Sequence, residues 1–343
     1  MLAAARVTLK QHRFEVMVAA LAAVAAAALG LSIAIRIDAL HVSQACLDQV
    51  RASQDGSGIG EGCLSLVQAG TGILGETYLS GEGSLPLSVM GALPFLLGLL
   101  GGVPIVAREL EAGTAQTAWS LNGSRIRWLA RQVAPIAVVL GSAMTVAALV
   151  AIPVGDLWVR WGYGGASSLI GLHGLLAIVR AFGAFGLGLA VGALLGRTLP
   201  AFIFGVALAL ALLYATGQAR ETWLSTLPPS IITEKSPETG EWNNIPGAVA
   251  TSWGWLTPDG DLLSREEARK LASDAGVPPA DPNDVQDTPA GVWLEQHGYV
   301  GVSLGVTDEM AMRWAPYDGL IFGLVGLASL GATVVLVNRR RPT

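Results

Sequence analysis

The chain has 343 residues, of which 52% are apolar and only 14% charged, and its mean hydropathy is +0.53. Soluble globular domains rarely combine so few charges with so many apolar residues, so the composition argues against a soluble protein and predicts a membrane protein. The net charge of −5 averages segments of opposite sign and gives no indication of nucleic-acid binding.

Apolar residues occur in blocks, and a helix that crosses a bilayer needs about 20 of them. The first block is alanine-rich and close to the N-terminus, but it is too long for a signal peptide and has no tidy small-residue cleavage site. We expect it to stay as a helix. The sequence therefore predicts an all-α polytopic membrane protein with six transmembrane helices, at about 14–35, 85–107, 133–154, 167–195, 199–215 and 319–337.

The first two predicted elements have distinct patterns. Residues 1–13 space apolar and basic side chains as in a helix that lies in the lipid headgroup layer. The second spanning helix contains Pro94 and Pro104, and an internal proline removes a backbone donor and bends a helix. We expect a bent helix here, which makes Pro94 a candidate for a substrate path.

A polar segment, residues 108–132, separates the second and third apolar blocks. Glu109 and Gly113 belong to a polar stripe with helical spacing, and Trp119 belongs to an apolar one. Asn122-Gly123 is a strong turn signal, after which Ser124 can cap the next helix. The segment predicts a short amphipathic helix parallel to the membrane, followed by a tight turn into the third spanning helix.

Arg180 lies near the middle of the fourth predicted helix, where exposure to lipid would cost at least about 2.5 kcal/mol. His173 lies two turns earlier on a similar face, so this face is expected to point into a bundle or a water-filled cavity. A substrate-path role and a structural role both stay open. Small residues at every fourth position over 184–196 allow close helix packing, within one subunit or between two.

Two segments are long enough to form structure outside the membrane. Residues 37–84 contain Cys46 and Cys63, for which an oxidising envelope favours a disulfide worth about 3 kcal/mol, with two free thiols as the alternative. Residues 218–316 hold six of the ten tryptophans. Ser264 and Glu267 fit a capping box that opens a helix through Ala275, and we expect a few short helices here.

The basic residues predict the orientation, because lysine and arginine in short loops stay on the cytoplasmic side. Both termini are then cytoplasmic. The chain divides into three parts. Residues 1–217 hold helices one to five and the cytoplasmic segment 108–124, residues 218–316 form an extracellular domain, and residues 317–343 hold helix six and a basic tail. The cytoplasmic pieces carry eleven basic residues against two acids: Arg6, Lys10, Arg13, Arg108, Arg125, Arg127, Arg131, Arg197, Arg339, Arg340 and Arg341.

Catalytic and metal motifs are absent from the sequence. An ATPase would need a phosphate loop with the pattern G-x-x-x-x-G-K-[ST], and none of the three lysines follows a glycine. The four histidines are scattered, with no spacing typical of a metal site. The chain is therefore not expected to be an enzyme or to hold a metal.

One sequence pattern resembles a known family. The run Glu109-x-Glu111-x-Gly113-Thr114, followed by Ser124-Arg125 and a basic start to the third helix, is similar to the cytoplasmic loop of ABC-2 type transporter permeases. Where the family has a proline, this chain has Asn122-Gly123, a different turn former. The stretch 192–202 and the outer segment 293–299, which is similar to actinobacterial members, extend the resemblance over essentially the whole chain.

The resemblance implies the membrane subunit of an ABC exporter in the cell membrane. Such a subunit pairs with a second permease copy, here as a homodimer, and binds two copies of a separate ATPase that holds ATP and magnesium. The loop would form a coupling helix that contacts the ATPase. The residues implied in coupling are Glu109, Glu111, Gly113, Thr114, Trp119, Ser124 and Arg125, and those suggested for the substrate path are His173, Arg180 and Pro94.

The expected cargo is a hydrophobic or amphipathic small molecule, such as an antibiotic, or a lipid. The alternative is a non-transporting subunit that relays the motion of the ATPase to an extracellular partner. A membrane-anchored receptor without an ATPase is the third possibility.

Overall fold

Six helices of the computed structural model are long and apolar enough to cross a membrane, as the sequence predicted. The structure describes residues 2–52, 61–75, 85–121, 124–161, 165–171, 174–235, 242–245, 248–277 and 289–340. Within these residues the six spanning helices are α2 (Arg13–Asp38), α5 (Leu85–Glu111), α7 (Arg125–Arg160), α8 (Gly174–Leu195), α9 (Thr198–Ser225) and α13 (Ala315–Arg339).

Most of these helices extend beyond the apolar blocks. A helix can continue past the apolar part of the membrane until a capping group ends it. The α7 helix begins at Arg125, where the Ser124 hydroxyl accepts a hydrogen bond from the Arg127 N–H at 3.1 Å. The fourth block is shorter than predicted. Residues 166–169 form a separate 3₁₀ turn, and α8 starts at Gly174.

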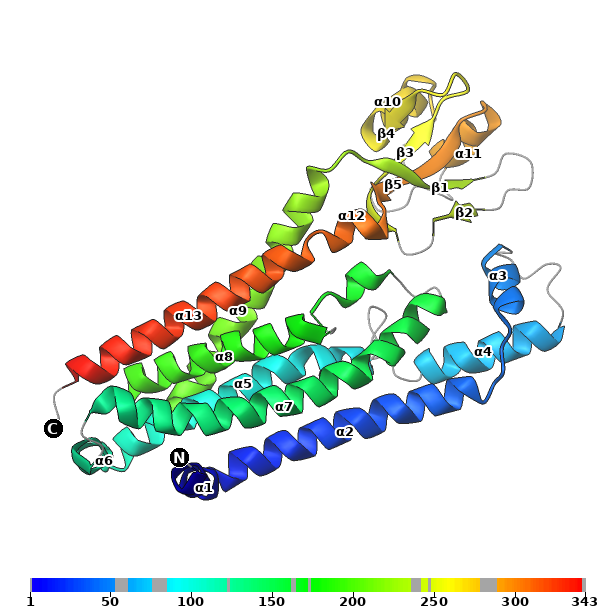
Figure 1. The fold of residues 1–343 in the computed structure, drawn as a ribbon. Helices are drawn as coiled ribbons and strands as arrows, with labels where there is room; N and C mark the ends of the chain where they lie inside the picture. Colours follow the sequence, from blue (N-terminus) through cyan, green and yellow to red (C-terminus); the bar gives the residue numbers. More distant parts are fainter. Residues whose placement is uncertain are drawn as a thin grey trace.

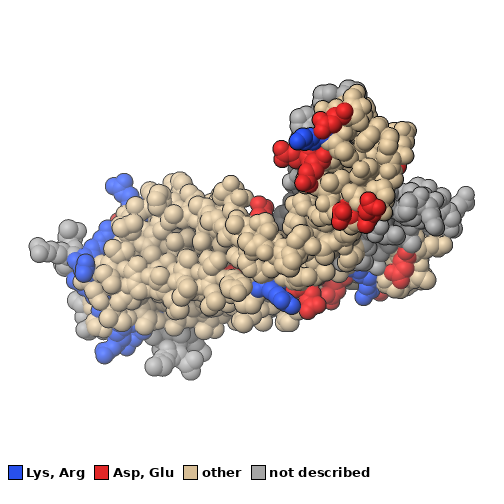
Figure 2. Space-filling view, turned by 90° about the horizontal axis from the view of Figure 1, so that it is seen from above, with Lys and Arg blue, Asp and Glu red and all other residues tan. Residues whose placement is uncertain are grey.

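Both chain termini lie at one end of the bundle (Figure 1). Two short helices, α1 (Leu2–Gln11) and α6 (Ala115–Leu121), lie at this end and are seen nearly end-on while the long helices run across the view. Lysine and arginine gather here, and acidic residues gather toward the opposite end (Figure 2). We call these the basic end and the sheet end; the assignment of the basic end to the cytoplasm remains a prediction from charge.

The α8 helix is the centre of the bundle, with α5 on one side and α13 on the other. A Cβ atom at Gly192 would lie 2.7 Å from the Val103 carbonyl oxygen of α5, and one at Gly186 would lie 2.6 Å from the Gly326 carbonyl oxygen of α13. Any side chain at these positions would force the helices apart. Gly192 of the predicted small-residue stripe therefore packs within one subunit.

The sheet end carries a five-stranded antiparallel sheet in the order β2-β1-β5-β3-β4, so the expectation of short helices alone was wrong. The central strand β5 is almost fully buried, so it lacks the alternation that marks a strand in sequence, and its partners are remote in the chain. The strands are β1 (Ser230–Lys235), β2 (Trp242–Asn244), β3 (Val249–Leu256), β4 (Leu262–Ser264) and β5 (Val300–Val306).

Three short helices accompany the sheet: α10 (Arg265–Asp274), α11 (Pro289–Gln296) and α12 (Asp308–Met312). Trp255 of β3 is buried with Ala268 of α10 and Leu294 of α11. The predicted capping box is confirmed, because Ser264 and Glu267 exchange hydrogen bonds between side chain and backbone at the start of α10.

A smaller outer element connects α2 to α5. It contains α3 (Gln44–Ala52) and α4 (Glu61–Gly75), which a disulfide between Cys46 and Cys63 joins with Cα atoms 5.8 Å apart. The linkage closes the turn region between two helices that share few other contacts in the described part of the chain.

Acid should weaken the start of α10. Hydrogen bonds from the Ser264 hydroxyl and N–H hold the pKa of Glu267 below its usual 4.5. Because the pKa is lowered in the folded state, the ionised carboxylate stabilises the fold at pH values above the usual pKa. This contribution is lost as the pH falls through the lowered pKa. As the pH falls below about 5 and through the lowered pKa, hydrogen exchange of residues 265–274, corrected for intrinsic rates, should therefore show a loss of protection.

Glu267→Gln should remove this pH dependence and lower the protection at neutral pH. The neighbouring Glu266→Gln is the matched control and should behave as wild type. Equal acid sensitivity in both variants would contradict the assignment to Glu267.

Candidate functional site

The turn between α5 and α6 gives the glutamate-glycine-threonine motif a structural explanation. Gly113 has a φ of +68°, a left-handed conformation that favours glycine at the end of a helix. The Thr114 N–H donates to the Glu109 carbonyl at 3.1 Å, and its hydroxyl donates to the Glu109 carboxylate at 2.6 Å. The motif therefore ends α5 and fixes the direction in which α6 leaves.

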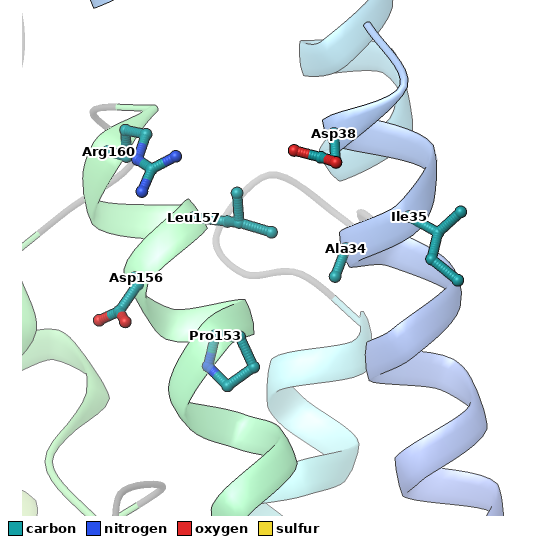
Figure 3. A pocket seen from close by; sticks show the side chains of 7 residues that line it. All are labelled: Ala34, Ile35, Asp38, Pro153, Asp156, Leu157 and Arg160. Atoms are coloured by element: carbon teal, nitrogen blue, oxygen red, sulfur yellow. The ribbon is translucent and has the colours of Figure 1, made fainter. Parts of the chain in front are cut away.

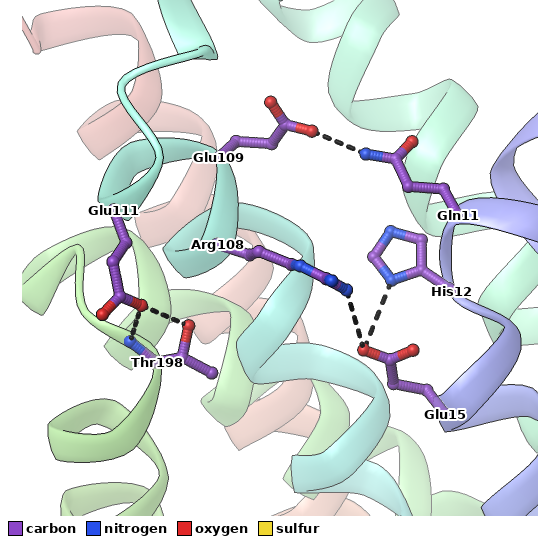
Figure 4. Close-up of polar contacts among 7 residues, drawn as sticks. All are labelled: Gln11, His12, Glu15, Arg108, Glu109, Glu111 and Thr198. Carbon is purple, nitrogen blue, oxygen red and sulfur yellow. Dashed lines mark hydrogen bonds and ion pairs between the residues drawn. The ribbon is translucent and has the colours of Figure 1, made fainter.

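The two carboxylates of the motif bind different neighbours (Figure 4). The Gln11 amide of α1 donates to Glu109 Oε1 at 2.7 Å. The Thr198 N–H and hydroxyl donate to Glu111 Oε2 at 3.0 and 2.7 Å. Because Thr198 is the first residue of α9, Glu111 lies at the positive end of that helix, where a negative charge is favourable. We call the end of α5 and the turn into α6, residues 109–114, the joint. The joint thus holds α1, α5 and α9 together.

Glu15 at the start of α2 forms a second contact to α5 at the same end (Figure 4). Its Oε1 atom lies 3.7 Å from His12 Nδ1 and 3.9 Å from an Arg108 guanidinium nitrogen, and its side chain is only 9% exposed. The other carboxylate oxygen is buried with no hydrogen-bond partner among the described residues. The charge of Glu15 is therefore only partly compensated.

The α6 helix is anchored by its tryptophan. Trp119 is 8% exposed and meets Trp128 of α7 edge to face, with ring centroids 6.2 Å apart. The Arg125 guanidinium lies 4.5 Å from the Trp119 ring centroid. The exposed members of the predicted coupling set are instead Ser124 and the turn that contains Glu111, Gly113 and Thr114. A partner chain could reach the turn, whereas Trp119 holds α6 on α7.

Arg125 also binds the last turn of α13, a contact that the sequence gave no sign of. One of its guanidinium nitrogens donates to the carbonyl oxygens of Val337, Asn338 and Arg340 at 2.9, 2.9 and 2.7 Å. The last carbonyls of a helix have no partner within the helix, and a cation there is favourable. Arg125 therefore connects α6, α7 and α13.

Arg180 has a buried partner that the sequence analysis missed. Its Nε and one terminal nitrogen each donate to Asp318 in the first turn of α13 at 2.9 Å, and Asp318 is 1% exposed. This bidentate pair joins α8 to α13 and supports the structural interpretation of Arg180. Pro94 is buried in α5, and His173 lies outside the described residues. Their role in a substrate path stays a prediction.

No set of three or more histidine, cysteine or acidic side chains in the described ranges could hold a metal ion. The features at the basic end are contacts between helices and an exposed turn. Six spanning helices joined in this way define the chain as an integral membrane protein whose candidate site is a mechanical joint.

A family model described as ABC-2 membrane transporter related matches residues 16–220, which is more than half of the chain. The chain belongs to this family, as its motif resemblance predicted. Families of this kind are typically non-catalytic membrane subunits that work with an ATPase. The match begins within α2 and ends within α9, and it includes the turn between α5 and α6. No match was found among curated proteins or among solved structures.

Removing the Arg125 side chain should loosen the end of α13. Arg125→Ala leaves three carbonyls without this donor, and hydrogen bonds from a charged group contribute about 1.5–3 kcal/mol. Amides over 334–340 should exchange about tenfold faster or more, as measured by hydrogen–deuterium exchange. Arg127→Ala, which removes an exposed arginine from the same turn, should leave these rates unchanged.

Breaking the Arg180–Asp318 pair should destabilise the bundle. Asp318→Ala leaves a buried guanidinium without its counter-charge, a change that costs about 3–5 kcal/mol. The double variant Arg180→Met/Asp318→Leu removes both charges and should recover most of the loss. Reversible unfolding in lipid or detergent measures both. A single variant as stable as wild type would show that the pair does not join α8 to α13 in the protein.

Proposed function

We propose that the chain is the permease subunit of an ATP-driven exporter in the cell membrane. Two permease copies form a homodimer, and two copies of a separate ATPase, which holds ATP and magnesium, bind at the basic end. Membership of the ABC-2 membrane transporter related family supports an ATPase partner in general terms. The lack of a phosphate-loop motif in the sequence supports a separate motor.

The observation that carries the proposal is the construction of the α5–α6 joint. Its turn is exposed at Glu111, Gly113 and Thr114, so a partner can contact it. Its surroundings are fixed, because Glu109 binds α1, Glu111 binds α9 and Trp119 packs on α7. A push on the exposed turn is therefore passed to several helices at once. A loop without these contacts would yield instead.

The proposed cargo is a hydrophobic or amphipathic small molecule, such as an antibiotic, or a lipid, moved outward. The lipid-facing bundle supports a cargo that can partition into the bilayer, because much of α2, α9 and α13 remains uncovered in the single chain. The acidic sheet end supports release of compounds that carry positive charge (Figure 2).

A second candidate function is the relay of ATPase motion to an extracellular partner, and the link to the sheet favours it. Four residues separate α9 from β1, and a single residue separates β5 from α12. Trp223 of α9 and Trp314 at the start of α13 pack with ring centroids 5.6 Å apart. Because Arg125 binds the other end of α13, movement of the joint would reach the sheet.

Reconstitution with the partner ATPase tests the proposal. The full-length chain and a candidate ABC ATPase would be placed in proteoliposomes, and ATP turnover and ATP-dependent efflux of amphipathic dyes measured. Glu109→Ala/Glu111→Ala should reduce efflux per ATP by about fivefold or more while membrane insertion survives, because the joint no longer holds α1 and α9.

Glu266→Ala/Glu309→Ala, two acids at the sheet end, is the matched control and should behave as wild type. ATP turnover that depends on the joint without any efflux would favour the relay. Failure of an ATPase to bind the chain, or wild-type coupling in the joint variant, would contradict the proposal.

A further inference from the structure

The turn between α8 and α9, residues 196–198, is held from two sides at the basic end. Gly196 ends α8 with a φ of +61°, and its N–H donates to the Gly192 carbonyl at 2.9 Å. Only Arg197 separates it from Thr198, the first residue of α9. Any displacement of so short a turn is passed directly to both helices. We call these three residues the α8–α9 turn.

One side of the α8–α9 turn is bound by the joint. The Thr198 N–H and hydroxyl donate to the Glu111 carboxylate at 3.0 and 2.7 Å (Figure 4). This contact ties the start of α9 to the end of α5. Because both hydrogen bonds end on the same oxygen atom, the contact is a single point of attachment, about which the turn could pivot.

The other side of the α8–α9 turn is bound by Arg340, the residue that follows α13. Its guanidinium donates to the carbonyl of Ala193, in the last turn of α8, at 2.9 Å, and a cation is favourable at this end of a helix. A Cβ atom at Gly196 would lie 3.0 Å from one of the guanidinium nitrogens. Glycine at this position therefore ends α8 and also leaves room for the arginine.

Arg340 is itself fixed by contacts that lead back to α6. Its carbonyl accepts a hydrogen bond from Arg125 at 2.7 Å, and the Arg125 guanidinium lies 4.5 Å from the centroid of the Trp119 ring. Trp119 belongs to α6, which directly follows the joint. Two separate routes therefore lead from the joint to the α8–α9 turn. One passes directly through Glu111, and the other passes through α6, Arg125 and the end of α13.

The contact between α2 and α7 is more open. At the sheet end these two helices border a groove of about 330 Å³ (Figure 3). The Asp38 carboxylate and the Arg160 guanidinium point into this space, so opposite charges face each other across it. By contrast, α8 packs on α5 and α13 through glycines that bring the backbones together. Movement of the joint therefore has a tighter path to the sheet end through α8 and α13 than through α2.

We propose that Arg340 is a positioning residue for coupling, because together with Glu111 it holds the α8–α9 turn at two points and makes it move with the joint as one body. With two attachments the turn cannot pivot, so a push on the exposed residues 111–114 displaces α8 and α9 together. The role in coupling rests on the proposed function. The mechanical link between Glu111 and Arg340 does not.

Hydrogen exchange resolved to single amides tests the link in the full-length chain, placed in phosphatidylcholine nanodiscs without an ATPase. The Thr198 N–H reports the contact with Glu111, and the Gly196 N–H reports the end of α8. Arg340→Ala should speed exchange of the Thr198 amide about tenfold, although the hydrogen bond that it removes is to α8, because the turn can then pivot. Glu111→Ala should speed exchange of the Gly196 amide in return, since coupling between two contacts is reciprocal.

Two variants separate this contact from a general disturbance of the C-terminal tail. Arg339→Ala removes the neighbouring exposed arginine, and both amides should exchange as in wild type. Arg340→Lys keeps a donor and the positive charge, so it should restore most of the protection. An unchanged Thr198 amide in Arg340→Ala, or equal acceleration in Arg339→Ala, would overturn the proposal.

Reconstitution with the candidate ATPase tests the role in coupling. Arg340→Ala should lower efflux per ATP about threefold or more, while the affinity for the ATPase stays as in wild type because the exposed residues 111–114 are intact. A purely structural defect would lower the amount of folded protein and leave efflux per ATP unchanged, and that result would overturn the positioning role. If the wild-type chain binds no ATPase, the proposed function and the role in coupling both fall, while the exchange results still decide the link between Glu111 and Arg340.

Discussion

Close packing of α8 between α5 and α13 sets the positions of the other elements. In lipid the burial of apolar side chains drives helix association only weakly, so contact between backbones takes its place. Glycines of α8 bring it against carbonyl oxygens of both neighbours, and the Arg180–Asp318 pair fixes the rotation of α8 relative to α13. The joint on α5 and the sheet on α13 are both held by this central contact.

The contacts at the basic end of the bundle are built on helix termini. At the basic end, glutamates and Arg125 bind helix termini, where their charges are favourable, and each contact joins elements remote in the chain. This arrangement suits transmission of force.

The chain enters the sheet domain from α9 and leaves it into α13. The N–H groups of Ala166 and Ser167, between α7 and α8, also donate to the Asp308 carboxylate of α12. Its core, around Trp255, Ala268 and Leu294, is separate from the membrane core. A second small cluster, with Leu224 of α9 and Val306 of β5, lies at the junction. The domain therefore has its own stability and still follows the ends of two helices.

The sequence by itself determined the six helices, the joint motif and the capping box, because each depends on local composition or on residues a few positions apart. Only the tertiary structure decided that Asp318 pairs with Arg180, that Arg125 binds the end of α13 and that Trp119 faces inward. It also decided the sheet, whose central strand pairs with residues about 44 to 75 positions away. Such contacts depend on how the chain folds back on itself, and local spacing does not encode them.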